Sequence, residues 1–295
     1  MDCSGTGDRG IFLTGYGGKG TSVLRSLICI LSLTAALAHA QEAAAPAGKA
    51  LVLTTAYGTR FDAYVSGPED ASRAVLLLHD RFGLNDQMRD WADRFAGLGY
   101  RALAIDLYDG RRAKSWKQAT AIMKSIDQVW ADTDIEAALS YLKKRQPDRK
   151  VVLLGWDYGG TEALLATLRD PTAVAATVSY YPTHLDTSPS SAQTVEGPMM
   201  IVLAERDDEL NIKRRQQAVK EGLGKARVNF IVMGLDALSN LREIAAVLRT
   251  RMDINVTGLD ADRGFNDPAS DHYDPAATAT IWDETQQFLV RNVTP

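Results

Sequence analysis

From Leu51 onward, short apolar runs alternate with longer stretches of helical periodicity. The central runs are continuously apolar, as expected for parallel strands that helices cover on both faces. This alternation is typical of βαβ units and predicts an α/β fold with a mostly parallel central sheet. The expected strands lie at 51–54, 60–66, 74–78, 101–105, 150–154, 175–180, 199–203 and 228–233.

Helical stretches separate these runs, at 86–98, in two segments within 115–145, at 161–169 and at 275–290. Within 115–145 we expect a break near Asp127 or Asp132. The last helix has Asp274 as its predicted N-cap, followed by proline at the first helical position. A helical period over 238–249 and an apolar run over 252–256 add one further helix–strand unit before it.

The N-terminal segment has the pattern of a secretory signal. Arg25 precedes an apolar run over 27–37, and Ala38-His39-Ala40 supplies the small residues that signal peptidase requires before Gln41. The apolar run is too short to cross a bilayer. We therefore expect export to the periplasm or the medium, with a signal peptide at 1–40, a spacer at 41–49 and a single domain at 50–295.

The positions of the cysteines and the net charge exclude several classes of site and partner. Both cysteines, Cys3 and Cys29, lie in the predicted leader, so the mature chain would have no disulfide, thiolate metal site or thiol nucleophile. Removing the leader changes the formal net charge from −4 to −5, and no run of Lys and Arg is longer than three residues. We therefore expect a small-molecule ligand or substrate and no nucleic acid, membrane, metal or cofactor as partner; the sequence indicates no oligomeric state.

One glycine-framed turn has the context of a catalytic site. The run Gly155-Trp156-Asp157-Tyr158-Gly159 follows an apolar strand and opens a helix, as the nucleophile elbow of α/β-hydrolases does. Glycines at its two ends remove Cβ atoms that would collide in a sharp turn. Asp157 would then point above the sheet, and the N–H of Tyr158 would face a developing oxyanion.

Further segments in the same order resemble the dienelactone hydrolase family. His79-Asp80-Arg81-Phe82-Gly83-Leu84 is similar to the family's His-Glu-x-Phe-Gly-Leu, and Asp106-Leu107-Tyr108 to its Asp-Leu-Tyr. Near the C-terminus, Arg263-Gly264-Phe265 and Tyr273-Asp274-Pro275-Ala276-Ala277 resemble its His-Gly-Phe segment and the helix start that follows. The resemblance implies an α/β-hydrolase fold and an oxyanion hole formed by Arg81 and Tyr158.

At the positions that match the family's catalytic residues, this sequence has different residue types. Asp157 occupies the nucleophile position, where the family has Cys or Ser, and Arg263 occupies the position of the general base His. The family's active-site Glu corresponds to the shorter Asp80. The resemblance assigns the triad acid to Asp207, or to Asp236 if the register shifts by one helix–strand unit.

These substitutions close the ordinary esterase route. Arginine cannot accept a proton, and carboxylate attack on an ester would give a less stable mixed anhydride. The favoured hypothesis is a weak or inactive hydrolase in which Asp157, Arg263 and Asp207 form an ion cluster and the cleft binds a small anionic or polar ligand. A second hypothesis is an active hydrolase that uses Asp157 on an sp³ carbon, with His272 as base. A third is a non-enzymatic envelope protein.

Overall fold

The computed structural model of the protein describes residues 48–183, 197–204, 206–207 and 254–294, all within one compact unit. In these ranges a single sheet has the strand order β1-β2-β4-β3-β5-β6-β7-β8. The strands are β1 (Lys49–Thr54), β2 (Arg60–Ser66), β3 (Arg73–Leu78), β4 (Arg101–Ile105), β5 (Lys150–Trp156), β6 (Ala176–Tyr180), β7 (Met199–Ala204) and β8 (Ile254–Leu259).

The mostly parallel sheet that the apolar runs predict is confirmed. The pairs β4–β3, β3–β5, β5–β6, β6–β7 and β7–β8 are parallel, whereas β1–β2 and β2–β4 are antiparallel. The central strands β3, β4 and β5 are buried almost throughout, because helices cover both of their faces. The carboxyl ends of all parallel strands consequently meet at one edge of the sheet.

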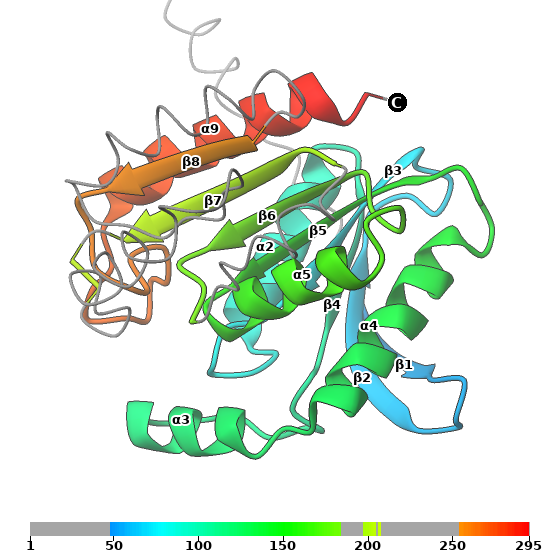
Figure 1. Ribbon diagram of the computed structural model, residues 1–295, viewed down its shortest axis with the longest axis horizontal. Helices are drawn as coiled ribbons and strands as arrows, with labels where there is room; N and C mark the ends of the chain where they lie inside the picture. The colour runs from blue at the N-terminus through cyan, green and yellow to red at the C-terminus, as the bar shows by residue number, and fades with distance from the viewer. Residues whose placement is uncertain (1–47, 184–196, 205, 208–253, 295) are drawn as a thin grey trace, which may run out of the picture. The chain divides into compact units, whose positions relative to one another are not determined.

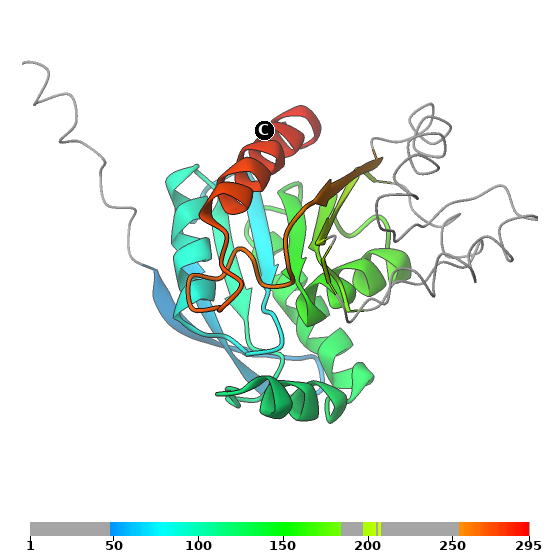
Figure 2. The same ribbon diagram turned by 90° about the vertical axis from the view of Figure 1, so that its left-hand side faces the viewer.

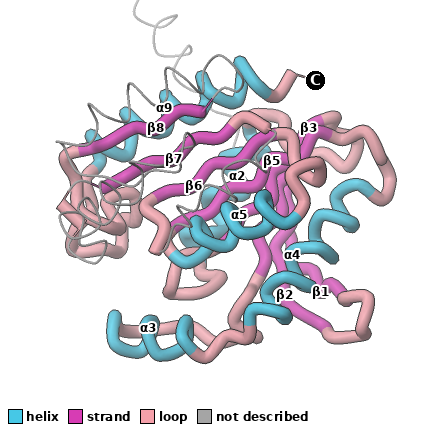
Figure 3. The backbone as a smooth tube through the Cα atoms, viewed as in Figure 1, coloured by secondary structure: helices cyan, strands magenta, loops and turns pink. Residues whose placement is uncertain are grey.

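Two pairs of helices cover the two faces of the sheet (Figure 1). On one face lie α4 (Gln128–Lys143) and α5 (Tyr158–Arg169), and on the other α2 (Asp86–Gly97) and α9 (Pro275–Asn292). The buried side chains form one apolar cluster on each face, as a three-layer α/β architecture requires. The short helix α3 (Trp116–Lys124) lies at the margin of the fold (Figure 3). Ala119 is its one fully buried residue, and Ile122 and Met123 pack against the apolar cluster on the α4/α5 face.

Helix boundaries follow the capping signals closely. Asp127 accepts a hydrogen bond from Val129 N–H and marks the break between α3 and α4. Asp274 accepts from the N–H groups of Ala276 and Ala277 at the start of α9. Both caps confirm the sequence-based expectation, because a short carboxylate satisfies N–H groups that the first helical turn leaves open.

Two boundaries at the elbow differ from the prediction. Strand β5 continues two residues beyond the predicted end, because Trp156 still pairs with Tyr180 of β6. Helix α5 begins at Tyr158, three residues earlier than predicted, so a single residue separates strand from helix. The last strand lies at Ile254–Leu259, shifted from the expected 252–256.

Other expectations concern parts of the chain outside the described residues. These are the signal peptide with both cysteines, the spacer up to residue 47, the strand at 228–233 and the helix at 238–249. Asp236 also belongs to this group. Among the helices that the structure describes, none combines the length and the apolar character needed to span a membrane.

The segment between β8 and α9 lies at the end of the sheet where the parallel strands terminate. Figure 2 looks at this end and shows that segment, in orange, beside the cyan loop that follows β3. A hydrogen bond from the Gln87 side chain to the carbonyl of Asn266 joins α2 to it. This end of the sheet therefore brings together the loops after β3, β5, β7 and β8.

Candidate functional site

Asp157 occupies a strained backbone position between β5 and α5. Its φ of 54° and ψ of −112° lie outside the regions that L-residues ordinarily adopt. A Cβ at Gly155 would lie 2.0 Å from the carbonyl oxygen of Gly159, and a Cβ at Gly159 would lie 2.3 Å from that of Leu78. Both glycines are therefore required by the turn, and the predicted sharp elbow is confirmed.

The Asp157 carboxylate is clamped by Arg81. The Arg81 Nε donates to Oδ2 of Asp157, and Nη2 donates to Oδ1 at 2.7 Å. The backbone N–H of Arg81 also donates to Oδ2, at 3.2 Å. The expected proximity of this N–H to Asp157 is confirmed, but the donor already binds the protein's own carboxylate rather than facing an open oxyanion position.

Arg263 joins the same carboxylate to a second acid. Its Nη1 donates to Oδ1 of Asp157, and its Nη2 forms an ion pair with Oδ2 of Asp207. Nη1 donates in addition to the carbonyl oxygen of Tyr181 at 2.6 Å. The described residues thus contain a carboxylate–guanidinium–carboxylate contact of the kind that the sequence suggested, with Asp207 as its second carboxylate.

The four charged side chains of this cluster are buried. Asp157 is 2%, Arg81 1%, Arg263 5% and Asp207 5% exposed. Burial by itself would raise the pKa of the Asp157 carboxyl, but the hydrogen bonds from Arg81 and the charge of Arg263 outweigh it and hold that pKa below its usual range. Asp157 is therefore a paired carboxylate anion at neutral pH.

Asp80 lies beside this cluster, but the pKa of its carboxyl shifts in the opposite direction to that of Asp157. Its Oδ1 accepts a hydrogen bond from Phe82 N–H at 2.8 Å. Burial, followed by the negative charge of Asp157, raises the pKa of Asp80 to about 7. Two neighbouring carboxyls thus differ in protonation near neutral pH, because one has guanidinium partners and the other has none among the described residues.

The two histidines that the structure describes, His79 and His272, take no part in this cluster. His79 is fully buried, its Nε2 accepts the N–H of Leu107 at 3.0 Å, and its Nδ1 lies 2.6 Å from the carbonyl oxygen of Asp80. Because Nε2 accepts, Nδ1 carries the proton, and His79 acts as a scaffold residue. The imidazole of His272 is 59% exposed, and its Nδ1 lies 4.0 Å from Asp262.

A cavity of about 620 Å³ opens above the cluster. Its floor includes Asp80, Asp157 and Arg263, and His272 lies on its rim. Aromatic side chains form part of its wall, and this volume suits a small molecule. Asp80, Phe82, Asn85, Arg112, Ala113, Lys114, Ser115, Trp116, Asp157, Tyr181, Arg263, Gly264, Asp267, Ala269, Ser270, Asp271 and His272 line it.

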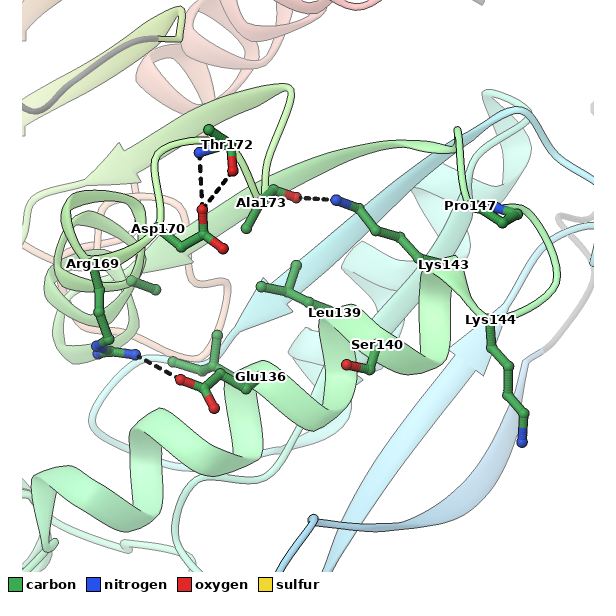
Figure 4. Close-up of a pocket in the computed structure, with 12 residues that line it drawn as sticks. Glu136, Leu139, Ser140, Lys143, Lys144, Pro147, Arg169, Asp170, Thr172 and Ala173 are labelled. Carbon is green, nitrogen blue, oxygen red and sulfur yellow. Dashed lines mark hydrogen bonds and ion pairs between the residues drawn. The ribbon is translucent and has the colours of Figure 1, made fainter.

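A second depression lies between α4 and the end of α5 (Figure 4). Four of its five charged side chains, all but Lys144, have partners within the described part of the protein. Lys143 Nζ donates to the carbonyl of Ala173 at 2.6 Å, and Arg169 forms ion pairs with Asp132 and Glu136. We therefore place the candidate site in the cavity above Asp157. Among the described residues, no group of three or more His, Cys, Asp or Glu side chains is arranged to hold a metal ion.

Sequence reasoning missed two side chains of the site. It assigned Arg81 a backbone role alone, because the matching family motif leaves that position unspecified. It gave Trp116 no role, yet the guanidinium carbon of Arg81 lies 4.1 Å from the centre of the Trp116 ring. The available signal for Arg81 was a basic residue directly after a buried strand and next to an acid.

Comparison with known proteins agrees with this architecture. The carboxymethylenebutenolidase of Pseudomonas putida is 28% identical over 179 residues, which cover 57% of this chain and 74% of that protein. The human carboxymethylenebutenolidase homolog is 28% identical over 157 residues, 51% of this chain and 63% of the relative.

Solved structures show the same fold. A dienelactone hydrolase-like promiscuous phosphotriesterase from metagenomic libraries superposes with a TM-score of 0.62 at 21% identity, covering 83% of this chain and 99% of that one. The dienelactone hydrolase of Anabaena variabilis gives 0.56 at 17% identity, with 85% and 100% covered. The expected α/β-hydrolase fold is thus confirmed. Because the family model also matches residues 61–234, more than half of the chain, the protein belongs to the dienelactone hydrolase family.

Proposed function

We propose that this protein binds a small molecule in the cavity above Asp157 and does not hydrolyse esters at a useful rate. The observation that carries this proposal is the clamp on the Asp157 carboxylate, which receives hydrogen bonds from Arg81 and Arg263 at once. A carboxylate whose oxygens are bound by two guanidinium groups is a poor nucleophile, because attack would require it to give up both partners.

The general base and one of the oxyanion donors that acyl transfer would need are also missing or already bound within the protein. Arg263 at the base position is always protonated and cannot take a proton from a nucleophile or a water. The Arg81 N–H, half of the expected oxyanion hole, donates to Asp157 itself. An ester carbonyl in the cavity would therefore meet no free nucleophile and, of the two expected oxyanion donors, not the Arg81 N–H, which supports a degenerate triad.

A rate assay with p-nitrophenyl acetate tests this proposal. We expect the wild-type protein and Asp157→Asn to hydrolyse it at the same rate, indistinguishable from that of a matched surface variant, Asp90→Asn. Asp90 is an exposed residue of α2. Hydrolysis by the wild type at least about tenfold faster than by Asp157→Asn would overturn the proposal, since it would require chemistry at that carboxylate.

A second candidate function rests on the position of His272, which lines the same cavity as Asp157. In that reaction the Asp157 carboxylate would attack an sp³ carbon, displacing halide from a haloalkane or opening an epoxide to an alkoxide that takes a proton from water. His272 would then activate the water that hydrolyses the alkyl ester on Asp157 and restores the carboxylate. Incubation with styrene oxide followed by mass spectrometry of the peptide with Asp157 tests it. A covalent adduct that accumulates in His272→Ala would support this function, and its absence would exclude it.

We also propose that the protein acts outside the cytoplasm, after removal of residues 1–40. The support is the basic residue, apolar run and Ala38-His39-Ala40 site of the leader. N-terminal sequencing of the protein from an expressing culture tests this. A mature chain that begins at Gln41 agrees with export, whereas a chain that retains Cys29 contradicts it.

A further inference from the structure

The cavity floor contains two carboxyl groups that lack a cationic partner in the described part of the chain. Asp80 and Asp267 are 9% and 8% exposed, and both line the cavity. Each accepts one side-chain hydrogen bond, from Phe82 N–H and Ala269 N–H respectively, both at 2.8 Å. No second donor to either carboxyl lies among the described residues, and neither second oxygen is a fully enclosed unpaired atom, so both carboxyls can meet a ligand in the cavity.

At the floor of the cavity, acidic side chains outnumber basic ones among the described residues. In the described part of the chain the acids there are Asp80, Asp157, Asp207 and Asp267, and the bases are Arg81 and Arg263. Both guanidinium groups are engaged by Asp157 and Asp207, so they do not neutralise the other two acids. Once Asp80 and Asp267 have lost their protons, four carboxylates face two guanidinium groups among the described residues, which gives this part of the floor a negative potential.

The rim does not correct this balance. Arg112 is held by Asp106 at 3.2 Å, which leaves little of its charge for the cavity. Lys114 and Asp271, both exposed, carry opposite charges. The excess negative charge therefore lies at depth, where water screens it least.

Aromatic rings line the same cavity as the two acids. Phe82, Trp116 and Tyr181 line the cavity, and Phe82 and Trp116 contact each other with ring centres 5.8 Å apart. Ring faces attract organic cations through their quadrupoles, most strongly where water is excluded. Buried carboxylates beside aromatic walls are the chemistry that selects a cation over a neutral or anionic analogue.

We infer that the ligand of this cavity is a small organic cation, an ammonium or amidinium compound, whose charged group pairs with Asp80 and Asp267. This inference rests on the proposed binding function and names its ligand class. It departs from the anionic or polar ligand expected from the sequence, because the basic residue at position 263 is consumed by Asp157 and Asp207.

The affinity should depend on pH in a defined direction. Asp80, with its pKa of about 7, must lose its proton to pair with a cation, so binding should strengthen as pH rises from about 6 to about 8. Burial also raises the pKa of Asp267. The groups that act on Asp80 are Asp157, Asp267, His79, Tyr108 and Tyr181, with Arg81 and Arg263 opposite Asp157.

Isothermal titration of the intact protein with benzylammonium, benzyl alcohol and benzoate tests the inference. The three probes share a ring and differ in charge, and benzylammonium stays protonated from about pH 6 to about pH 8. We expect benzylammonium to bind at least about tenfold more tightly than the other two at pH 8, and less tightly at pH 6. Asp80→Asn and Asp267→Asn should each weaken it by about tenfold, whereas Asp90→Asn should not.

Preference for benzoate or benzyl alcohol, or no binding of benzylammonium at millimolar concentration, would overturn the inference. The pH series on the wild type keeps the test valid if a variant fails to fold, because loss of the pH effect would equally contradict a role for Asp80. Binding of benzoate without ester turnover would contradict the inference that the ligand is a cation, but it would still agree with the proposal that the protein does not hydrolyse esters. Ester turnover that depends on Asp157 would instead overturn the proposed function.

Discussion

Arg81 and Asp157 form a two-pronged ion pair in which the guanidinium Nε and Nη2 each donate to a different carboxylate oxygen. The pair joins the loop after β3 to the elbow after β5, across 76 residues of sequence. Trp116 stacks on the guanidinium, so this ion pair is shielded from water although Trp116 itself is 43% exposed. Planar, bidentate pairing of this kind favours arginine over lysine.

Replacing Arg81 should be strongly destabilising. Arg81→Met keeps most of the side-chain volume but leaves the buried Asp157 with Arg263 as its remaining described guanidinium partner. We expect the free energy of unfolding to fall by about 3–5 kcal/mol in urea titrations. The matched control, Arg89→Met, breaks the exposed pair with Asp86 and should lower it by less than about 1 kcal/mol. Equal losses in the two variants would contradict the role given to Arg81.

Asp80 should destabilise the fold at high pH. The folded chain keeps its proton up to about pH 7, whereas an aspartate in the unfolded chain ionises near pH 4. The folded state therefore binds more protons between these values, and the stability contribution of Asp80 falls as pH rises through this window. Asp80→Asn, which cannot ionise, should raise the free energy of unfolding by at most about 4 kcal/mol near pH 8.

Near pH 4 the same substitution should have almost no effect, because Asp80 is then protonated in the folded chain and partly so in the unfolded one. Urea titrations at several pH values measure the difference, with Asp90→Asn as the control for removal of an exposed carboxylate. A difference between Asp80→Asn and the wild type that stays constant from pH 4 to pH 8 would show that Asp80 does not titrate as described.

A double substitution should introduce ester cleavage. Asp157→Cys with Arg263→His supplies a nucleophile and a base at the elbow, retains Asp207, and frees the Arg81 N–H to face an oxyanion. The Arg81 guanidinium would also favour the thiolate form of the new nucleophile. We expect p-nitrophenyl acetate cleavage at least about tenfold above either single variant. A folded but inert double variant would show that more than these two positions separates the cleft from catalysis.

Much of the fold follows from local signals in the sequence. Asp127 and Asp274 stand at helix starts where a carboxylate can accept N–H groups, and both cap helices there. Gly155 and Gly159 frame a turn that no side chain could enter, so the elbow was predictable from them. The end of β5 was not, because the pairing of Trp156 with Tyr180 depends on a neighbouring strand rather than on local pattern.

The site was predictable from the sequence where a residue type allows only one role, as with an arginine, which cannot act as a base. An arginine at position 263 opposite two acids indicated an ion cluster, and the structure contains it. The choice between Asp207 and Asp236 could not be made from the sequence, since each follows an apolar run; Asp207 contacts Arg263, whereas Asp236 lies outside the described residues. The side-chain role of Arg81 and the unpaired state of Asp80 and Asp267 depend on long-range packing, which periodicity does not encode.

A double-mutant cycle on Asp157 and Arg263 tests the central claim most directly, because it measures whether the residues at two of the family's triad positions act as a structural ion pair. The free energies of unfolding of Asp157→Asn, Arg263→Gln and the double variant give the coupling between the two side chains. We predict that Arg263→Gln alone lowers stability by several kcal/mol and that the coupling energy is about 2–3 kcal/mol. A coupling energy near zero would contradict the account.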